Sequence, residues 1–142
     1  MSQRSGAQRD LARRLLLREQ RGDGPDEPAA AAGRVHTKLQ LCLAPLVGAA
    51  GVRALFARSL AQTTPEFPFL AAVALEPPEA ALESLTAALQ GTHPAAVLNG
   101  AAALFGAFLT LLATFVGERL TAQVLSVAWP DDGETFAKEP VK

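Results

Sequence analysis

Residues Ala95–Gly117 read AAVLNGAAALFGAFLTLLATFVG and contain no Asp, Glu, Lys, Arg or His. The uncharged run begins earlier still, because the 34 residues from Ser84 to Gly117 lack Asp, Glu, Lys and Arg. A helix that is apolar on every side must be buried in protein or in lipid. We therefore predict a long central helix over about residues 94–128, bounded by Pro94 and Pro130. The fold depends on what covers this helix.

Small residues recur along one side of the predicted helix at alternating spacings of three and four. A seam of this kind allows a neighbouring helix to approach closely, both in membranes and in soluble bundles. We predict a helix-packing seam made of Gly100, Ala103, Ala107, Thr110, Thr114, Gly117 and Thr121.

The residues around the apolar run favour burial in protein over burial in a lipid bilayer. The nearest basic residue upstream is Arg58, and no Trp or Tyr marks the N-terminal edge of the run, so the usual membrane anchors are missing there. Asn99 would be costly in hydrocarbon unless it were paired. A membrane span remains the alternative, because the run is long enough to cross a bilayer.

The rest of the chain predicts amphipathic helices that could wrap around the central one. Apolar residues recur at helical spacing before Pro45, again from Val52 to about Gln62, and from Pro78 to Gly91. Pro45 should end or kink its helix, and Gly48 and Gly51 flank a turn before the next helix. The proline-rich residues 63–78 read as irregular. The predicted fold is all-α, a bundle of four to five helices around residues 94–128.

Three segments differ in composition. Residues 1–24 predict a basic helix that is loosely attached, residues 25–130 a helical bundle domain, and residues 131–142 an acidic, disordered tail. Within the first segment, leucines share one face of a helix over residues 8–21 and arginines surround them. This basic amphipathic helix is the candidate partner-binding site, with Arg9, Arg13, Arg14, Arg18, Leu11 and Leu15 as its residues.

The sequence offers little support for catalysis or cofactor binding. The net charge of -1 provides no bulk attraction to nucleic acid, and one cysteine excludes an internal disulfide. His36 and Cys42 are six residues apart and lie on different sides of an ideal helix. Glu79 and Glu83 share a face but lack the Glu-x-x-His pattern of helical metal sites. We predict no enzyme activity, no cofactor and no metal site.

Three hypotheses about function follow. The first is a non-enzymatic protein-interaction or regulatory protein of bacterial type in the cytoplasm, binding a protein partner or a second copy of itself. The second is a small single-span protein of the inner membrane that associates through the small-residue seam. The third is a helical bundle that binds an apolar ligand among its Phe and Leu side chains.

Overall fold

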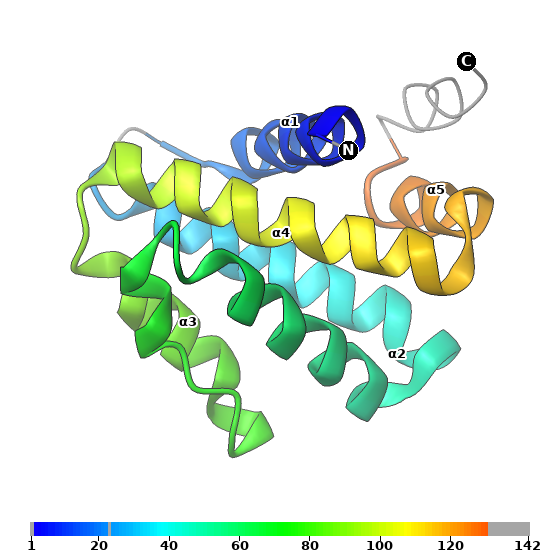
Figure 1. Ribbon diagram of the computed structural model, residues 1–142. Helices are drawn as coiled ribbons and strands as arrows, with labels where there is room; N and C mark the ends of the chain where they lie inside the picture. The colour runs from blue at the N-terminus through cyan, green and yellow to red at the C-terminus, as the bar shows by residue number, and fades with distance from the viewer. Residues whose placement is uncertain (1, 23, 131–142) are drawn as a thin grey trace.

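The computed structural model describes residues 2–22 and 24–130. In these two ranges the chain forms five α-helices and two short 3-10 helices, without a strand, so the predicted all-α class is confirmed. Figure 1 shows α1, α2 and α5 packed against α4, and α3 packed against α2. The predicted acidic tail, residues 131–142, lies outside the described residues. The elements are α1 (Ser2–Glu19), α2 (Glu27–Thr63), η1 (Pro68–Ala72), η2 (Pro78–Ala80), α3 (Ala81–Gln90), α4 (Pro94–Val116) and α5 (Glu118–Ala128).

Helix α4 is the centre of the bundle, covered mainly by α1 and α2. Pro94 starts it, and the His93 Nδ1 atom accepts a hydrogen bond from the backbone N–H of Ala95 at 3.2 Å. The rings of Phe105 and Phe108 are buried against Phe56 of α2, with centroids 5.9 and 6.1 Å from it. The apolar run therefore forms the core of a helical bundle.

The predicted helix over residues 94–128 is broken, which corrects the sequence-based expectation. Gly117 has φ 97° and ψ 155°, a left-handed conformation that residues with a Cβ rarely adopt. Its backbone N–H still bonds to the carbonyl of Ala113 at 2.8 Å, and α5 then starts at Glu118. The break allows α5 to turn back and bury Trp129, which is 3% exposed.

Helix α2 bends at Gly48, three residues after the proline at which the sequence predicts a kink. Gly48 has φ 82° and ψ 154°, whereas the helix continues through Pro45. The expected second and third helices are thus the two halves of α2, and Figure 1 shows the second half running back along the first. The bend exists because glycine can adopt a positive φ at low cost.

Helix α1 is longer than predicted, and its apolar face is packed against the other helices. It spans Ser2–Glu19, and its apolar face of Leu11, Ala12, Leu15 and Leu16 is at most 5% exposed. The crossing with α4 is tight: a Cβ atom added to Gly106 would lie 2.8 Å from the Cα of Arg9. The leucine face of α1 covers the apolar surface of α4, so it belongs to the core.

Two helices, α2 and α4, are long and apolar enough to cross a membrane by length and composition. In α4, 61% of the apolar window is buried inside the protein, whereas in α2 only 22% is buried. Core helices of soluble proteins pass the same test, so these lengths fit a cytoplasmic and a membrane location alike.

Candidate functional site

The predicted partner-binding helix is built into the fold. Leu11 and Leu15 are 5% and 1% exposed, so neither side chain is available to a partner in this arrangement. Arg9 donates two hydrogen bonds to the carboxylate of Glu66, with N–O distances of 3.3 and 3.4 Å. The arginines that suggested a binding face therefore also tie α1 to the rest of the chain.

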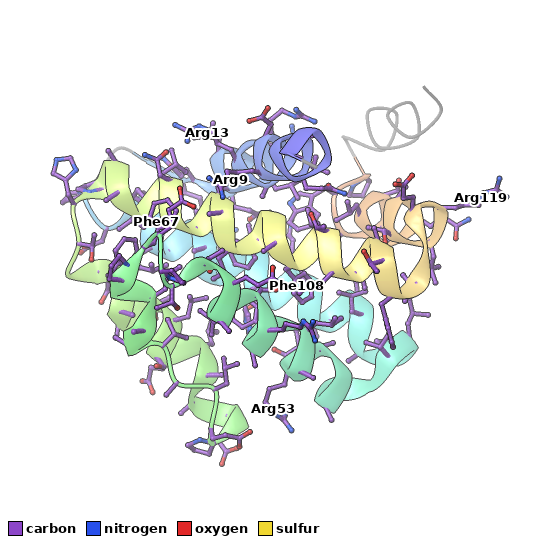
Figure 2. All side chains as sticks on the ribbon, in the orientation of Figure 1. Arg9, Arg13, Arg53, Phe67, Phe108 and Arg119 are labelled. Carbon is purple, nitrogen blue, oxygen red and sulfur yellow. The ribbon has the colours of Figure 1, made fainter. Side chains whose placement is uncertain are left out.

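The other three arginines of that set have partners within the chain too. The Arg13 Nη1 atom donates to the Oδ1 atom of Asn99 at 2.7 Å, which pairs the one side-chain amide of residues 95–117. Arg14 and Arg18 are exposed and take part in interactions of their own. Figure 2 shows Arg9 and Arg13 where α1 lies along α4.

The small-residue seam spreads over both the interior and the surface. Gly100, Ala103 and Thr121 are buried, Ala107, Thr110 and Gly117 are half-buried, and Thr114 is exposed. The three threonines bond to carbonyls one turn earlier in the chain, with O–O distances of 2.8 to 3.0 Å. The tightest approach to α1 is made by Gly106, which is outside the seam.

The bend of α2 carries an exposed apolar surface that the sequence-based predictions did not single out. The 14 residues from Leu39 to Val52 contain no charged side chain. Within this run Leu41 is 71% exposed and Leu46 is 51% exposed. We define the elbow surface by the exposed residues of this run other than the polar Gln40: Leu41, Pro45, Leu46, Gly48, Ala49 and Ala50. The lack of charge could be read from the sequence, but the exposure depends on the bend at Gly48.

Charges of both signs lie near the elbow surface. Arg53, just beyond the bend, pairs with Glu76 at an Nε–Oε2 distance of 3.1 Å. The C-terminal end of α4, with Phe115 70% exposed, lies at the same end of the bundle, and α5 opens there with Glu118 beside Arg119. In Figure 2, Arg53 and Arg119 both project away from the helices. The rim is therefore close to neutral.

A buried polar cluster joins three distant parts of the chain. The Glu19 carboxylate, 7% exposed, accepts a hydrogen bond from Trp129 Nε1 at 2.8 Å and pairs with Lys38. The Lys38 ammonium also lies 5.2 Å from the centroid of the Trp129 ring, a cation–π distance. Burial alone would raise the pKa of the Glu19 carboxyl, but the hydrogen bonds from Lys38 and Trp129 outweigh it and lower the pKa.

A groove of about 760 Å³ lies beside this cluster, between α2 and α3. The cations on its α2 side already have acidic partners: Lys38 pairs with Glu19, and Arg34 with Glu27 at 3.2 Å. Gly33 brings the two helices together, because a Cβ there would lie 3.0 Å from Thr86 Cγ2. The charges on the α2 side thus hold the ends of α1 and α2 in place.

We expect Glu19→Gln to lower the free energy of unfolding by about 1–2 kcal/mol at pH 7, since it removes the charge that Lys38 faces. The loss is moderate because the Lys38 side chain is 41% exposed and can still be hydrated. The pKa of Glu19 is depressed in the folded protein, so its stabilisation is present above the ordinary value of 4.5 and lost as pH falls through the folded pKa. Denaturant unfolding at pH 7 and below pH 4.5 measures both effects.

Glu66→Gln is the matched control for this substitution. Glu66 also pairs with a basic side chain, that of Arg9, but the side chains of Arg9 and Glu66 are 45% and 56% exposed. Exposed ion pairs contribute about 0–1 kcal/mol, so this variant should unfold almost like the parent protein. An equal loss of unfolding free energy in the two variants would mean that the buried Glu19 cluster contributes no more to stability than an exposed ion pair.

The remaining titratable residues of the sequence analysis occupy separate places. His36 is 8% exposed and packs edge-on against Phe56, with ring centroids 4.8 Å apart. Cys42 is half-buried, and His93 caps α4. In residues 2–22 and 24–130, no three His, Cys, Asp or Glu side chains gather into a possible metal site.

No protein-family model, curated protein or solved structure matches the chain. The elbow surface is therefore the candidate functional site on physical grounds alone: it exposes large apolar side chains in a run without charge.

Proposed function

We propose that this chain is a non-enzymatic helical interaction protein that binds a protein partner through the elbow surface. The observation that carries the proposal is the exposure of Leu41 and Leu46, 71% and 51%, within 14 residues that lack any charge. Contiguous exposed apolar surface is typical of interaction sites, whereas single exposed apolar residues are normal. This site replaces the arginine-rich helix α1 as our proposed partner-binding surface.

The neutral rim supports a protein partner over an anionic membrane surface. Peripheral membrane helices usually add basic residues to their apolar face. Here Arg53 is paired with Glu76, and Arg119 has Glu118 as its neighbour, so the rim adds no net positive charge. We accordingly propose a cytoplasmic protein whose partner presents an uncharged apolar face.

A second copy of the chain meets this description. A symmetric dimer brings the same patch of both copies together, which is unfavourable for a charged patch but not for an uncharged one. Gly48, Ala49 and Ala50 at the apex would also allow two backbones to approach closely. Self-association through the elbow surface is therefore the first interaction to measure.

We expect the double variant Leu41→Glu/Leu46→Glu to weaken association by at least about a hundredfold, because a charge buried without a partner costs several kcal/mol. Sedimentation velocity over a range of concentrations measures this change for the second copy. Cross-linking in cells, compared between the parent protein and the variant, measures it for other proteins. Val127→Glu is the matched control, since Val127 is also 71% exposed but lies on α5.

The proposal is wrong if the parent protein stays monomeric at all concentrations and shows the same cross-links as the double variant. It is also wrong if the parent protein, but not the double variant, co-sediments with lipid vesicles or fractionates with the inner membrane. The elbow would in that case be a lipid-binding surface, as the membrane hypothesis requires.

A further inference from the structure

A buried histidine and a phenylalanine are in contact between the two halves of α2. His36 lies in the first half of α2 and Phe56 in the second half, and their rings meet edge-on at 63° with centroids 4.8 Å apart. Phe56 in turn packs against Phe105 of α4, with ring centroids 5.9 Å apart. The two halves of α2 therefore contact each other at His36 and Phe56, and Phe56 connects this contact to the core.

The imidazole of His36 has an unsatisfied polar atom. Among the described residues, its Nδ1 atom is the buried side-chain nitrogen or oxygen without a hydrogen-bond partner. It borders a cavity of about 20 Å³, just large enough for one water molecule. The other residues that line this cavity are Gln40, Ala49, Val52, Arg53, Phe56, Leu75 and Ala81.

The charges near His36 disfavour a second positive charge. Arg53, from the second half of α2, lines the same cavity, and its acidic partner Glu76 comes from the segment that precedes α3. From α3 itself the cavity receives Ala81, and from the segment before it Leu75. The lining thus contains a cation and no carboxylate, so an imidazolium at His36 would be buried without an opposite charge.

We propose that His36 is a pH-sensitive latch: its neutral imidazole keeps the two halves of α2 together, and its protonation opens the bend at Gly48. A charged ring must leave the contact with Phe56 to reach water, and the second half of α2 moves away with Phe56. Opening would rearrange the elbow surface. That consequence for binding rests on the proposed function above, whereas the opening itself does not.

The direction of the pH effect follows from burial. Burial lowers the pKa of the His36 imidazole below its ordinary value of 6.5. The open form binds a proton more readily than the closed form between the lowered pKa and 6.5. The closed form is therefore fully favoured above pH 6.5, and the open population rises by up to tenfold for each pH unit below it.

Hydrogen exchange of the full chain tests the latch. The exchange protection of backbone amides in residues 49–63 is measured from about pH 7.5 to about pH 5, corrected for intrinsic exchange, while NMR follows the His36 ring nitrogens in the same samples. In the parent protein we expect protection to fall by up to tenfold per pH unit below pH 6.5, and to level off where NMR shows that the closed form takes up protons at His36.

The chain has two histidines, which provides a matched pair of variants. His36→Phe keeps a ring in the Phe56 contact and should abolish the loss of protection. His93→Gln changes the exposed histidine at the start of α4 and should leave that loss unchanged. A loss that persists in His36→Phe, or protection in the parent protein that stays constant between pH 6.5 and the pH at which NMR detects protonation of His36, would overturn the latch.

The parent-protein titration decides the question even if His36→Phe fails to fold. Binding is read separately, by comparing association of the parent protein at about pH 7.5 and about pH 5. Loss of protection without any association at either pH would keep the latch and reject the proposed function. Association through Leu41 and Leu46 with unchanged protection would keep the proposed function and reject the latch.

Discussion

A chain that starts at residue 25 should not form a stable bundle, because α4 loses the helix that covers one of its apolar sides. Leu11, Leu15 and Leu16 are at most 5% exposed. Complete burial of a leucine side chain contributes about 1.5–3 kcal/mol, so three of them represent about 5–9 kcal/mol. A domain of this size is stable by only about 5–15 kcal/mol in total.

Circular dichroism during thermal unfolding measures this loss. The full chain should unfold cooperatively, whereas residues 25–142 should show a broad transition or aggregate on expression. A cooperative transition of the shortened chain near that of the full chain would contradict the prediction and would restore the expectation of a loosely attached segment 1–24.

Two neighbouring leucines of α1 supply a control that leaves the chain length unchanged. Leu16 is 0% exposed and Leu17 is 48% exposed. Leu16→Ala should cost about 2–5 kcal/mol, as is typical of buried leucines, and Leu17→Ala less than about 1 kcal/mol. Similar costs at both positions would mean that α1 does not dock with the face seen in the structure.

The sequence indicated the apolar face of α1, but it could not indicate which residues its arginines contact. Leucines at helical spacing predict that a face is buried, but they do not say against what. The partners of Arg9 and Arg13 are 57 and 86 residues away in the chain, so no local pattern could reveal them. A basic amphipathic helix that docks on its own protein is identical in sequence to one that docks on a partner.

The two breaks in the helices show a similar limit. The prediction placed a turn between Gly48 and Gly51, but it also placed a kink or helix end at Pro45 and continued the last helix through Gly117. Pro45 does not interrupt α2, whereas Gly48 and Gly117 adopt a positive φ. Where a glycine leaves the helix depends on what the next segment packs against: α5 buries Trp129 against Glu19, a contact across 110 residues.

The exposure of the elbow surface is a consequence of the first break. A long run without charge predicts burial, and for α4 this is what the structure has. In α2 the bend at Gly48 turns part of an equally uncharged run outward, so that 22% of its apolar window is buried. The apolar segments of α2 and α4 could both be found from composition. Only the arrangement of the helices shows that the one in α4 is core and that part of the one in α2 is exposed.

Gly106→Ala should destabilise the bundle more than any other single methyl group added to α4. The new Cβ would lie 2.8 Å from the Cα atom and 3.0 Å from the N atom of Arg9. Both are backbone atoms, so no side-chain rotation can relieve the clash and α1 must move as a whole. We expect a net loss of about 1–3 kcal/mol, even though alanine favours helices by about 1 kcal/mol over glycine.

Gly100→Ala is the matched substitution in the same helix, and it also tests the predicted seam. Its Cβ would lie 2.5 Å from Phe69 Cζ, closer than any contact at Gly106, but this atom is the tip of a half-buried side chain that can rotate away. Gly100→Ala should therefore change the free energy of unfolding by less than about 1 kcal/mol, because helix propensity offsets the rearrangement.

Denaturant unfolding of the two variants, with exchange protection of the α1 amides as a second measurement, separates the two helix contacts. Only Gly106→Ala should loosen α1, since only this substitution meets the backbone of Arg9. A larger loss at Gly100 would instead mean that the seam of Gly100, Ala103 and Ala107 is the closest packing line of α4. The observed crossing at Gly106 would then not be what holds α1 in place.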